Sequence, residues 1–77
     1  PQILVNVKVR EKIAFETITA IAEEKRAIDT TLEGRGRLLL RYSGTENLAR
    51  VMIEGPDQSE IEILANTLAV RISESLS

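Results

Sequence analysis

The sequence predicts a single α+β domain over residues 1–77, in which a mostly antiparallel sheet of three to four strands carries two helices on one face. Two observations predict this class. Apolar and polar residues alternate over short runs at 3–10, 38–42 and 49–55, which is typical of half-buried strands. Apolar residues recur at helical spacing after the first run and after the last, so the expected order is β-α-β-β-α.

The first strand is expected over residues 3–10. Its apolar members share one face: Ile3, Val5, Val7 and Val9. A helix is expected over about residues 16–28, because apolar residues recur there at helical spacing: Ile18, Ile21, Ala22 and Ile28. The run from Thr30 to Gly36 contains β-branched residues and glycines, which predicts a connection and allows a fourth strand at 30–33.

Two further strands are expected at 38–42 and 49–55, joined as a hairpin by the glycine-bearing loop 43–48. Alternation divides their side chains between the two faces of the sheet. The face toward the helices receives Leu38, Leu40, Tyr42, Ala49, Val51 and Ile53, and the opposite face receives Leu39, Arg41, Arg50 and Met52. Arg41 and Arg50 are therefore expected beside the loop, on the face away from the helices.

The second helix has a clear start signal. Asp57 followed by Glu60 has the spacing of a capping box, in which each side chain binds the backbone amide of the other residue. An apolar stripe then follows: Ile61, Leu64, Ala65, Leu68 and Ile72. We expect an amphipathic helix of roughly four to five turns.

Composition excludes several classes of function. The 77 residues include no Cys and no His, which excludes disulfide scaffolds, Cys/His zinc sites, thiol chemistry and histidine acid–base catalysis. The net charge is −2, so the chain does not have the strong positive field of a nucleic-acid-binding protein. No apolar run approaches the about 20 residues of a membrane-spanning helix, and no signal segment is present, so a cytoplasmic protein without a membrane partner is expected.

Size also bears on function. A chain this short buries only about 60% of its unfolded surface, which leaves little room for an enclosed active site. The sequence begins at Pro1 without an initiator Met and runs directly into a strand-like segment. These features predict a domain taken from a longer protein.

One group of residues has the character of a binding site, and it surrounds the loop 43–48. Arginine presents a donor fork that matches phosphate oxygens, glycine permits the positive φ that turns amides inward, and hydroxyl groups add donors. Two arginines on neighbouring strands repel each other, and a bound anion would remove that repulsion. The candidate anion-binding residues are Arg41, Ser43, Gly44, Thr45, Asn47 and Arg50.

The loop has other interpretations. Its residue types are also ordinary in hairpin turns, and exposed arginine commonly serves solubility alone. Glu46 is unexpected in an anion site, where it would either orient one of the arginines by a salt bridge or contact a sugar hydroxyl. Tyr42 is expected in the core or at its rim.

Residues 41–55, RYSGTENLARVMIEG, resemble the C-terminal phosphate-binding signature of the α-D-phosphohexomutases. The opening PQILVNVKV at 1–9 and the GRGR at 34–37 are most similar to the phosphoglucosamine mutase branch, so the resemblance covers nearly the whole chain. It implies a TBP-like fold and the last of four domains of an enzyme that interconverts glucosamine 6-phosphate and glucosamine 1-phosphate for UDP-N-acetylglucosamine and peptidoglycan synthesis. A phosphoserine and Mg²⁺, with a glucosamine 1,6-bisphosphate intermediate, are implied for the parent enzyme and its other domains.

The role implied for this domain is to hold the phosphate that is not reacting. The resemblance maps that role onto Arg41, Ser43, Gly44, Thr45 and Arg50, and it implies no catalytic or metal-binding residue here, so the isolated domain is expected to be inactive. The sequence departs from the family pattern in two places. Many members have Pro where this chain has Asn47, and Pro or Lys where it has Tyr42.

Other functions stay open at this point. The same domain of a phosphomannomutase/phosphoglucomutase would carry a very similar loop. A small RNA-binding or assembly module is supported only by the arginines at 35, 37, 41 and 50, and it is opposed by the acidic charge balance and the few aromatic residues. A scaffold domain without a ligand is the remaining alternative.

Overall fold

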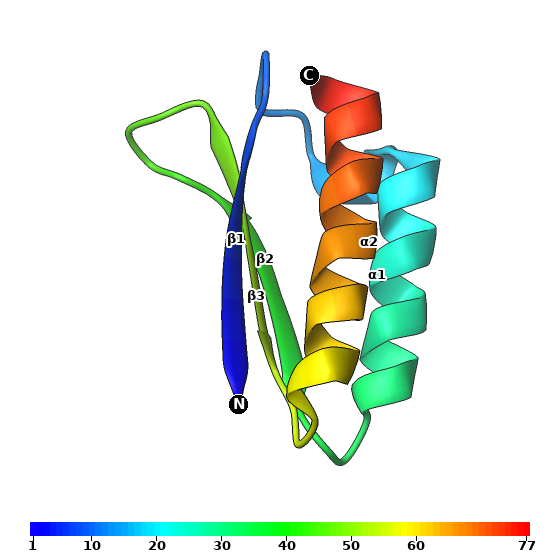
Figure 1. Ribbon diagram of the computed structural model, residues 1–77. Coiled ribbons are helices and arrows are strands. Elements are labelled where there is room, and N and C mark those ends of the chain that lie inside the picture. Colours follow the sequence, from blue (N-terminus) through cyan, green and yellow to red (C-terminus); the bar gives the residue numbers. More distant parts are fainter.

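The predicted order β-α-β-β-α is confirmed, with one short helix added. The computed structural model describes residues 1–77. Its elements are β1 (Gln2–Lys8), the 3-10 helix η1 (Phe15–Thr17), α1 (Thr19–Leu32), β2 (Arg37–Tyr42), β3 (Leu48–Glu54) and α2 (Gln58–Leu76). Figure 1 shows both long helices on the same side of the sheet, with the loop between β2 and β3 projecting away from them.

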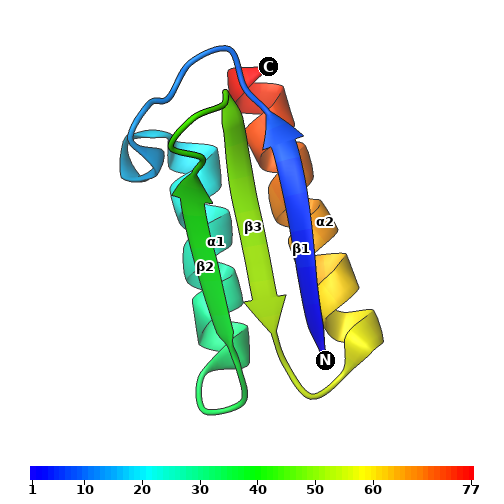
Figure 2. The same cartoon turned by 90° about the vertical axis from the view of Figure 1, so that its left-hand side faces the viewer.

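The sheet has three strands in the order β1-β3-β2, and both pairings are antiparallel. Figure 2 looks onto the face of the sheet that the helices leave open, with β3 between the two edge strands. Val51 of β3 lies between Val5 and Leu40 in the register, so the predicted helix-facing residues share one face. That face joins the helices in one hydrophobic core: Val7, Val9, Ile21, Ile28, Leu32, Leu38, Ala49, Val51, Ile53, Ile61, Ala65, Leu68, Ile72 and Leu76.

The predicted fourth strand at 30–33 is wrong, because these residues complete α1 instead of leaving it. Leu32 lies about one turn after Ile28, and both side chains are almost fully buried. Continuing the helix buries one more leucine side chain. The free energy gained by that burial exceeds the cost of the low helix propensity of Thr30 and Thr31. The helix also begins at Thr19 rather than near residue 16, because η1 occupies residues 15–17.

A glycine ends α1. Gly34 has a φ of 75°, the left-handed conformation that favours glycine after a helix. The amides of Arg35 and Gly36 then both donate to the Leu32 carbonyl, at 2.8 and 2.9 Å. The turn interpretation of this glycine-rich segment is confirmed.

The first strand ends two residues earlier than expected, at Lys8, and begins one residue earlier, at Gln2. The Arg10 amide donates to the Leu76 carbonyl at 2.7 Å, so the chain leaves the sheet there and crosses to the end of α2. Figure 2 shows the following segment passing over the end of the sheet, close to the β2–β3 loop.

Half of the predicted capping box forms at the start of α2. The Asp57 carboxylate accepts from the Glu60 amide at 3.2 Å, as expected for an N-cap. The Glu60 side chain does not return to Asp57 and instead pairs with Arg35 at 3.1 Å. The predicted stripe faces the core, with Leu64 at its margin and Leu76 extending it by one turn. Neither long helix combines the length and the apolar content that crossing a membrane requires.

Candidate functional site

The predicted arginine pair is present on the open face of the sheet. Arg41 of β2 and Arg50 of β3 are direct partners in the antiparallel register, and both side chains are exposed. They line a shallow hollow together with the apolar residues Leu4, Leu39 and Met52. The expectation that Leu39, Arg41, Arg50 and Met52 share the face away from the helices is therefore confirmed.

Neither arginine of the pair is neutralised. Arg35, Arg37 and Arg71 each have an acidic partner within 4.0 Å, whereas Arg41 and Arg50 have none and donate no hydrogen bond. Two like charges placed directly opposite each other on neighbouring strands are unfavourable. The pair therefore offers two unused guanidinium forks to an anion.

Ser43 organises the adjoining loop. It is the one buried polar residue of the chain, only 5% exposed. Its hydroxyl oxygen accepts from the amides of Thr45 and Glu46, at 3.3 and 3.2 Å, and its own amide donates to the Leu48 carbonyl at 2.8 Å. Ser43 thus shapes the loop from within, and because both hydroxyl contacts use the oxygen as acceptor, the hydroxyl hydrogen remains a donor.

The expected use of Gly44 is wrong. No positive φ occurs at this glycine, so the loop does not form the nest that the sequence predicted. The physical reason is that the Ser43 hydroxyl, rather than a left-handed turn, gathers the amides of Thr45 and Glu46. The amides of Gly44 and Asn47 have no partner within the chain and remain free.

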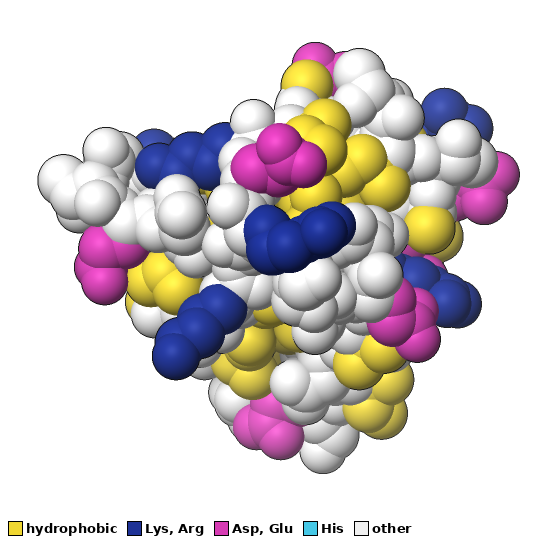
Figure 3. Space-filling view, turned by 90° about the horizontal axis from the view of Figure 1, so that it is seen from above, with side chains coloured by type: hydrophobic (Ala, Val, Ile, Leu, Met, Phe, Trp, Pro, Cys, Tyr) yellow, Lys and Arg dark blue, Asp and Glu magenta, His cyan; other side chains and the backbone are white.

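The other loop residues are exposed. The side chains of Thr45, Glu46 and Asn47 make no hydrogen bond and no ion pair within the chain. Glu46 therefore does not orient Arg41 or Arg50, and the first of its two expected roles is not seen. Figure 3, seen from above, shows the loop end projecting at the left, with Lys and Arg side chains beside it.

The structure adds two contacts that the sequence did not indicate. The Lys12 ammonium donates to the Ser43 carbonyl at 2.6 Å, and the Tyr42 hydroxyl donates to the Ile13 carbonyl at 2.6 Å. Both contacts join segments about 30 residues apart, so no local pattern could have predicted them. Burial raises the pKa of Tyr42 above its usual value, and the nearby Glu11 carboxylate raises it further.

The aromatic residues do not support RNA binding. The chain has one Phe, one Tyr and no Trp, and Phe15 and Tyr42 stack on each other with ring centroids 4.1 Å apart. Neither ring stands free on the open sheet face, where a base would need it. The open face of the sheet therefore presents no aromatic ring on which a base could stack.

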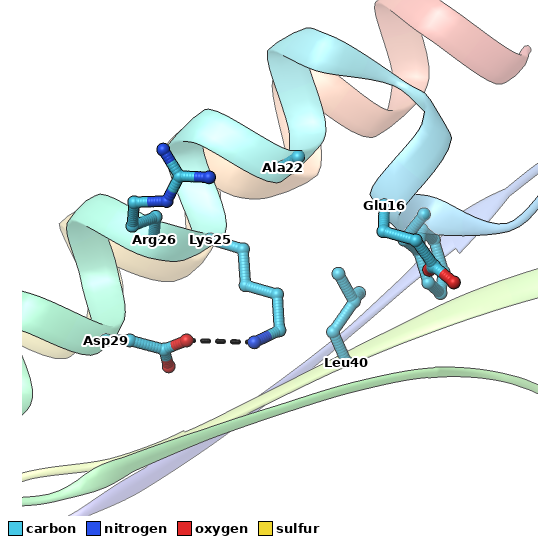
Figure 4. A pocket seen from close by; sticks show the side chains of 7 residues that line it. Glu16, Ala22, Lys25, Arg26, Asp29 and Leu40 are labelled. Carbon is cyan, nitrogen blue, oxygen red and sulfur yellow. Dashed lines mark hydrogen bonds and ion pairs between the residues drawn. The ribbon is translucent and has the colours of Figure 1, made fainter.

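A separate pocket lies between α1, η1 and β2. Figure 4 shows the Lys25 ammonium paired with the Asp29 carboxylate, at 2.8 Å, to one side of Leu40. Phe15, Glu16, Ala22 and Arg26 complete its lining. None of the residues predicted to bind an anion lines this pocket.

Metal binding is not supported by the residues of this chain. No three His, Cys, Asp or Glu side chains lie close enough together to hold a metal ion. The residues here therefore do not fit Mg²⁺, and no chemistry of the domain is assigned to a metal.

Comparison with known proteins places this geometry in a family. Residues 4–70 match the model of the phosphoglucomutase/phosphomannomutase C-terminal domain. The chain is 49% identical over all 77 residues to a phosphoglucosamine mutase of Solidesulfovibrio magneticus, and 52% identical over 69 residues, or 90% of this chain, to one of Chlamydia pneumoniae. It spans only 17% and 15% of the length of these relatives.

A solved structure of a related enzyme has the same fold over the whole of this chain. N-acetylphosphoglucosamine mutase of Aspergillus fumigatus, in complex with GlcNAc-6P and magnesium, matches the whole chain with a TM-score of 0.77 and 26% identity, over 16% of its own length. The predicted resemblance and the predicted fold class are both confirmed. This chain therefore belongs to the family of phosphoglucomutase/phosphomannomutase C-terminal domains.

Proposed function

We propose that this domain binds the phosphate group of a sugar phosphate through Arg41, Arg50 and the loop 43–48. The observation that carries the proposal is the pair of directly opposed, unneutralised arginines beside the free amides of Gly44 and Asn47. Phosphate offers several acceptor oxygens, which guanidinium forks and backbone amides bind with complementary geometry. An anion bound there would also relieve the repulsion between the two arginines.

Each predicted residue has a defined part in this proposal. Arg41 and Arg50 supply charge and paired donors from the sheet, while Gly44 and Asn47 supply amides from the loop. Thr45 adds an exposed hydroxyl, and the Ser43 hydroxyl keeps one hydrogen to donate while its oxygen holds the loop. Glu46 is left to accept from a sugar hydroxyl, the second of its expected roles.

The relatives point to the substrate class. The similar chains of Solidesulfovibrio magneticus and Chlamydia pneumoniae are phosphoglucosamine mutases. The Aspergillus fumigatus enzyme was solved with GlcNAc-6P, and a variant of it with glucose 1,6-bisphosphate. We therefore infer that a longer protein containing this domain interconverts glucosamine 6-phosphate and glucosamine 1-phosphate through a 1,6-bisphosphate, as an isomerase.

The domain's part in that reaction is to hold the phosphate that is not reacting. Binding energy from a remote group positions the other end of the sugar, where the transfer takes place. Because the bisphosphate must turn round between the two half-reactions, the binding site must also release its phosphate. The phosphoserine and Mg²⁺ of the proposed reaction belong to other domains, and the cytoplasmic location expected from the sequence stays a prediction.

A second substrate is supported by the family description. The matching model covers phosphoglucomutases and phosphomannomutases as well. The substrates of both classes are hexose phosphates, so Arg41 and Arg50 could bind the phosphate of either substrate. Arg41 and Arg50 therefore account for phosphate binding and not for the choice of sugar.

The test is an amide titration by ¹H–¹⁵N NMR with glucosamine 6-phosphate, with glucosamine and sulfate in parallel. We expect saturable shifts confined to residues 41–50, mimicked by sulfate and absent with glucosamine. The affinity is expected to be about millimolar, worth about 4 kcal/mol, because the domain supplies only part of the surface around the sugar.

Two variants sharpen the test. Arg50→Gln should abolish the shifts, whereas Arg26→Gln on α1 removes the same charge away from the site and should leave them unchanged. Shifts that persist in Arg50→Gln, or that spread evenly over the surface, would contradict the assigned site.

A further inference from the structure

A basic residue from outside the hairpin contacts the loop of the proposed phosphate site. Lys12 lies in the segment between β1 and η1, outside the hairpin that carries the other site residues. Its ammonium donates to the Ser43 carbonyl at 2.6 Å, across 31 positions of sequence. An ammonium group has three N–H donors, and this contact is the only one that Lys12 makes within the chain, so two donors remain.

The backbone on both sides of Lys12 is tied to the same hairpin. Before it, the Val9 amide donates to the Asn47 carbonyl at 3.0 Å. After it, the Ile13 carbonyl accepts from the Tyr42 hydroxyl at 2.6 Å, and Phe15 stacks on the Tyr42 ring. The segment that carries Lys12 is therefore attached to the hairpin on both sides of this residue, and its position does not depend on the Lys12 side chain alone.

Lys12, like Arg41 and Arg50, has no acidic partner. No carboxylate lies within 4.0 Å of its ammonium. Glu11 precedes it in the chain and Glu46 lies on the loop, and neither forms an ion pair with it. The charge of Lys12 is therefore available at the base of the loop.

We propose that Lys12 is a third basic residue of the phosphate site, which holds the loop through the Ser43 carbonyl and adds positive charge beside Arg41 and Arg50. This inference rests on the proposed function of the same site. Its distinctive claim is that the charge of Lys12, and not only its hydrogen bond, strengthens phosphate binding.

Three variants of Lys12 separate the effect of the charge from that of the hydrogen bond. Lys12→Gln keeps a side-chain N–H group but removes the charge, Lys12→Met removes both, and Lys12→Arg keeps both. Arg26→Gln, on α1, is the control for the loss of one positive charge elsewhere. Dissociation constants for inorganic phosphate would be measured for each by NMR titration at low salt and at about 0.5 M salt.

We expect Lys12→Gln and Lys12→Met to bind phosphate about fivefold more weakly at low salt, since one charge near an exposed site contributes on this scale. Lys12→Arg should bind within about twofold of the unmodified chain, and so should Arg26→Gln. High salt should shrink the difference between Lys12→Gln and the unmodified chain. Unchanged amide shifts for the core strands would show that each variant keeps its fold.

The failures can be told apart. If Lys12→Gln bound phosphate as tightly as the unmodified chain while Arg50→Gln did not bind, only the role of Lys12 would be overturned. If the unmodified chain and Arg50→Gln responded to phosphate alike, the proposed function itself would fall, and the role of Lys12 with it.

Discussion

Arg41 and Arg50 face each other across the β2–β3 ladder with no acidic side chain to separate them. Opposed like charges destabilise a strand pair by about 0.2–1 kcal/mol. The hairpin therefore carries a small cost in stability at the position where an anion would be bound. This relation between stability and binding can be measured directly.

Replacing one arginine of the pair should not weaken the fold. For Arg41→Gln or Arg50→Gln we expect a free energy of unfolding that is unchanged or about 0.2–1 kcal/mol higher at low salt. Arg37→Gln is the control, because Arg37 pairs with Glu54 at 3.2 Å and its loss relieves no repulsion. Denaturant unfolding would give the values, and a decrease of more than about 1 kcal/mol in Arg41→Gln or Arg50→Gln would show that the pair stabilises the sheet.

Phosphate should stabilise the fold only while the pair is intact. A ligand that binds the folded state raises the free energy of unfolding, by about 1.4 kcal/mol at a concentration ten times its dissociation constant. We expect this increase in the unmodified chain and not in Arg50→Gln, measured by denaturant unfolding with and without phosphate at constant ionic strength. An equal increase in both chains would point to a general salt effect rather than a site.

The loop itself depends on Ser43. Ser43→Ala removes the oxygen that accepts from the amides of Thr45 and Glu46, so we expect a loss of about 0.5–1.5 kcal/mol in the free energy of unfolding. Amide exchange at those two residues should also become faster. Thr45→Ala is a matched control in the same loop, because that hydroxyl makes no hydrogen bond, and its stability should change by less than about 0.5 kcal/mol. Equal effects of the two changes would contradict the organising role of Ser43.

The fold was predictable because its periodicities are local. Alternation in the strands identified the two faces correctly, including the shared outer face of Arg41 and Arg50. The end of α1 was missed because the β-branched residues Thr30 and Thr31 indicated a connection or a strand. Leu32 alone indicated that the helix continues, and its burial becomes apparent only when the helices pack on the sheet.

The site was predictable only in part. The chemistry of residues 41–50 could be identified from residue types and from the family resemblance. Two features were missed: the negative φ of Gly44, and the contact of Lys12 with the Ser43 carbonyl. The first accompanies local hydrogen bonds from the amides of Thr45 and Glu46 to the Ser43 hydroxyl, in a loop whose residue types also suit a left-handed glycine turn. The second joins residues 31 positions apart, which a local sequence pattern does not encode.

The two glycines of the α1–β2 connection should differ in their tolerance of alanine. Gly34 has a φ of 75° and open space around it, so Gly34→Ala is expected to cost about 1–2 kcal/mol from backbone strain alone. At Gly36 a Cβ would clash with the Glu54 carbonyl oxygen, so backbone atoms of β3 would have to move. Gly36→Ala is therefore expected to cost more than Gly34→Ala in denaturant unfolding, and the opposite order would mean that the connection repacks freely.

Tyr42 should make the stability of the fold fall at high pH. Burial, and then Glu11, raise its pKa above the usual value of 10.0, so the unfolded chain loses the phenol proton at a lower pH than the folded chain. The stability that Tyr42 contributes is thus fully present below pH about 10 and is lost as the pH rises through the folded pKa, where ionisation also removes the hydrogen bond to the Ile13 carbonyl. Because the chain has one Tyr and no Trp, ultraviolet absorbance of the phenolate follows this residue alone.

Tyr42→Phe keeps an aromatic ring beside Phe15 without the hydroxyl, so its free energy of unfolding should decline less above pH about 10. Parallel declines in the two chains would show that other groups, and not Tyr42, set the alkaline limit of the fold.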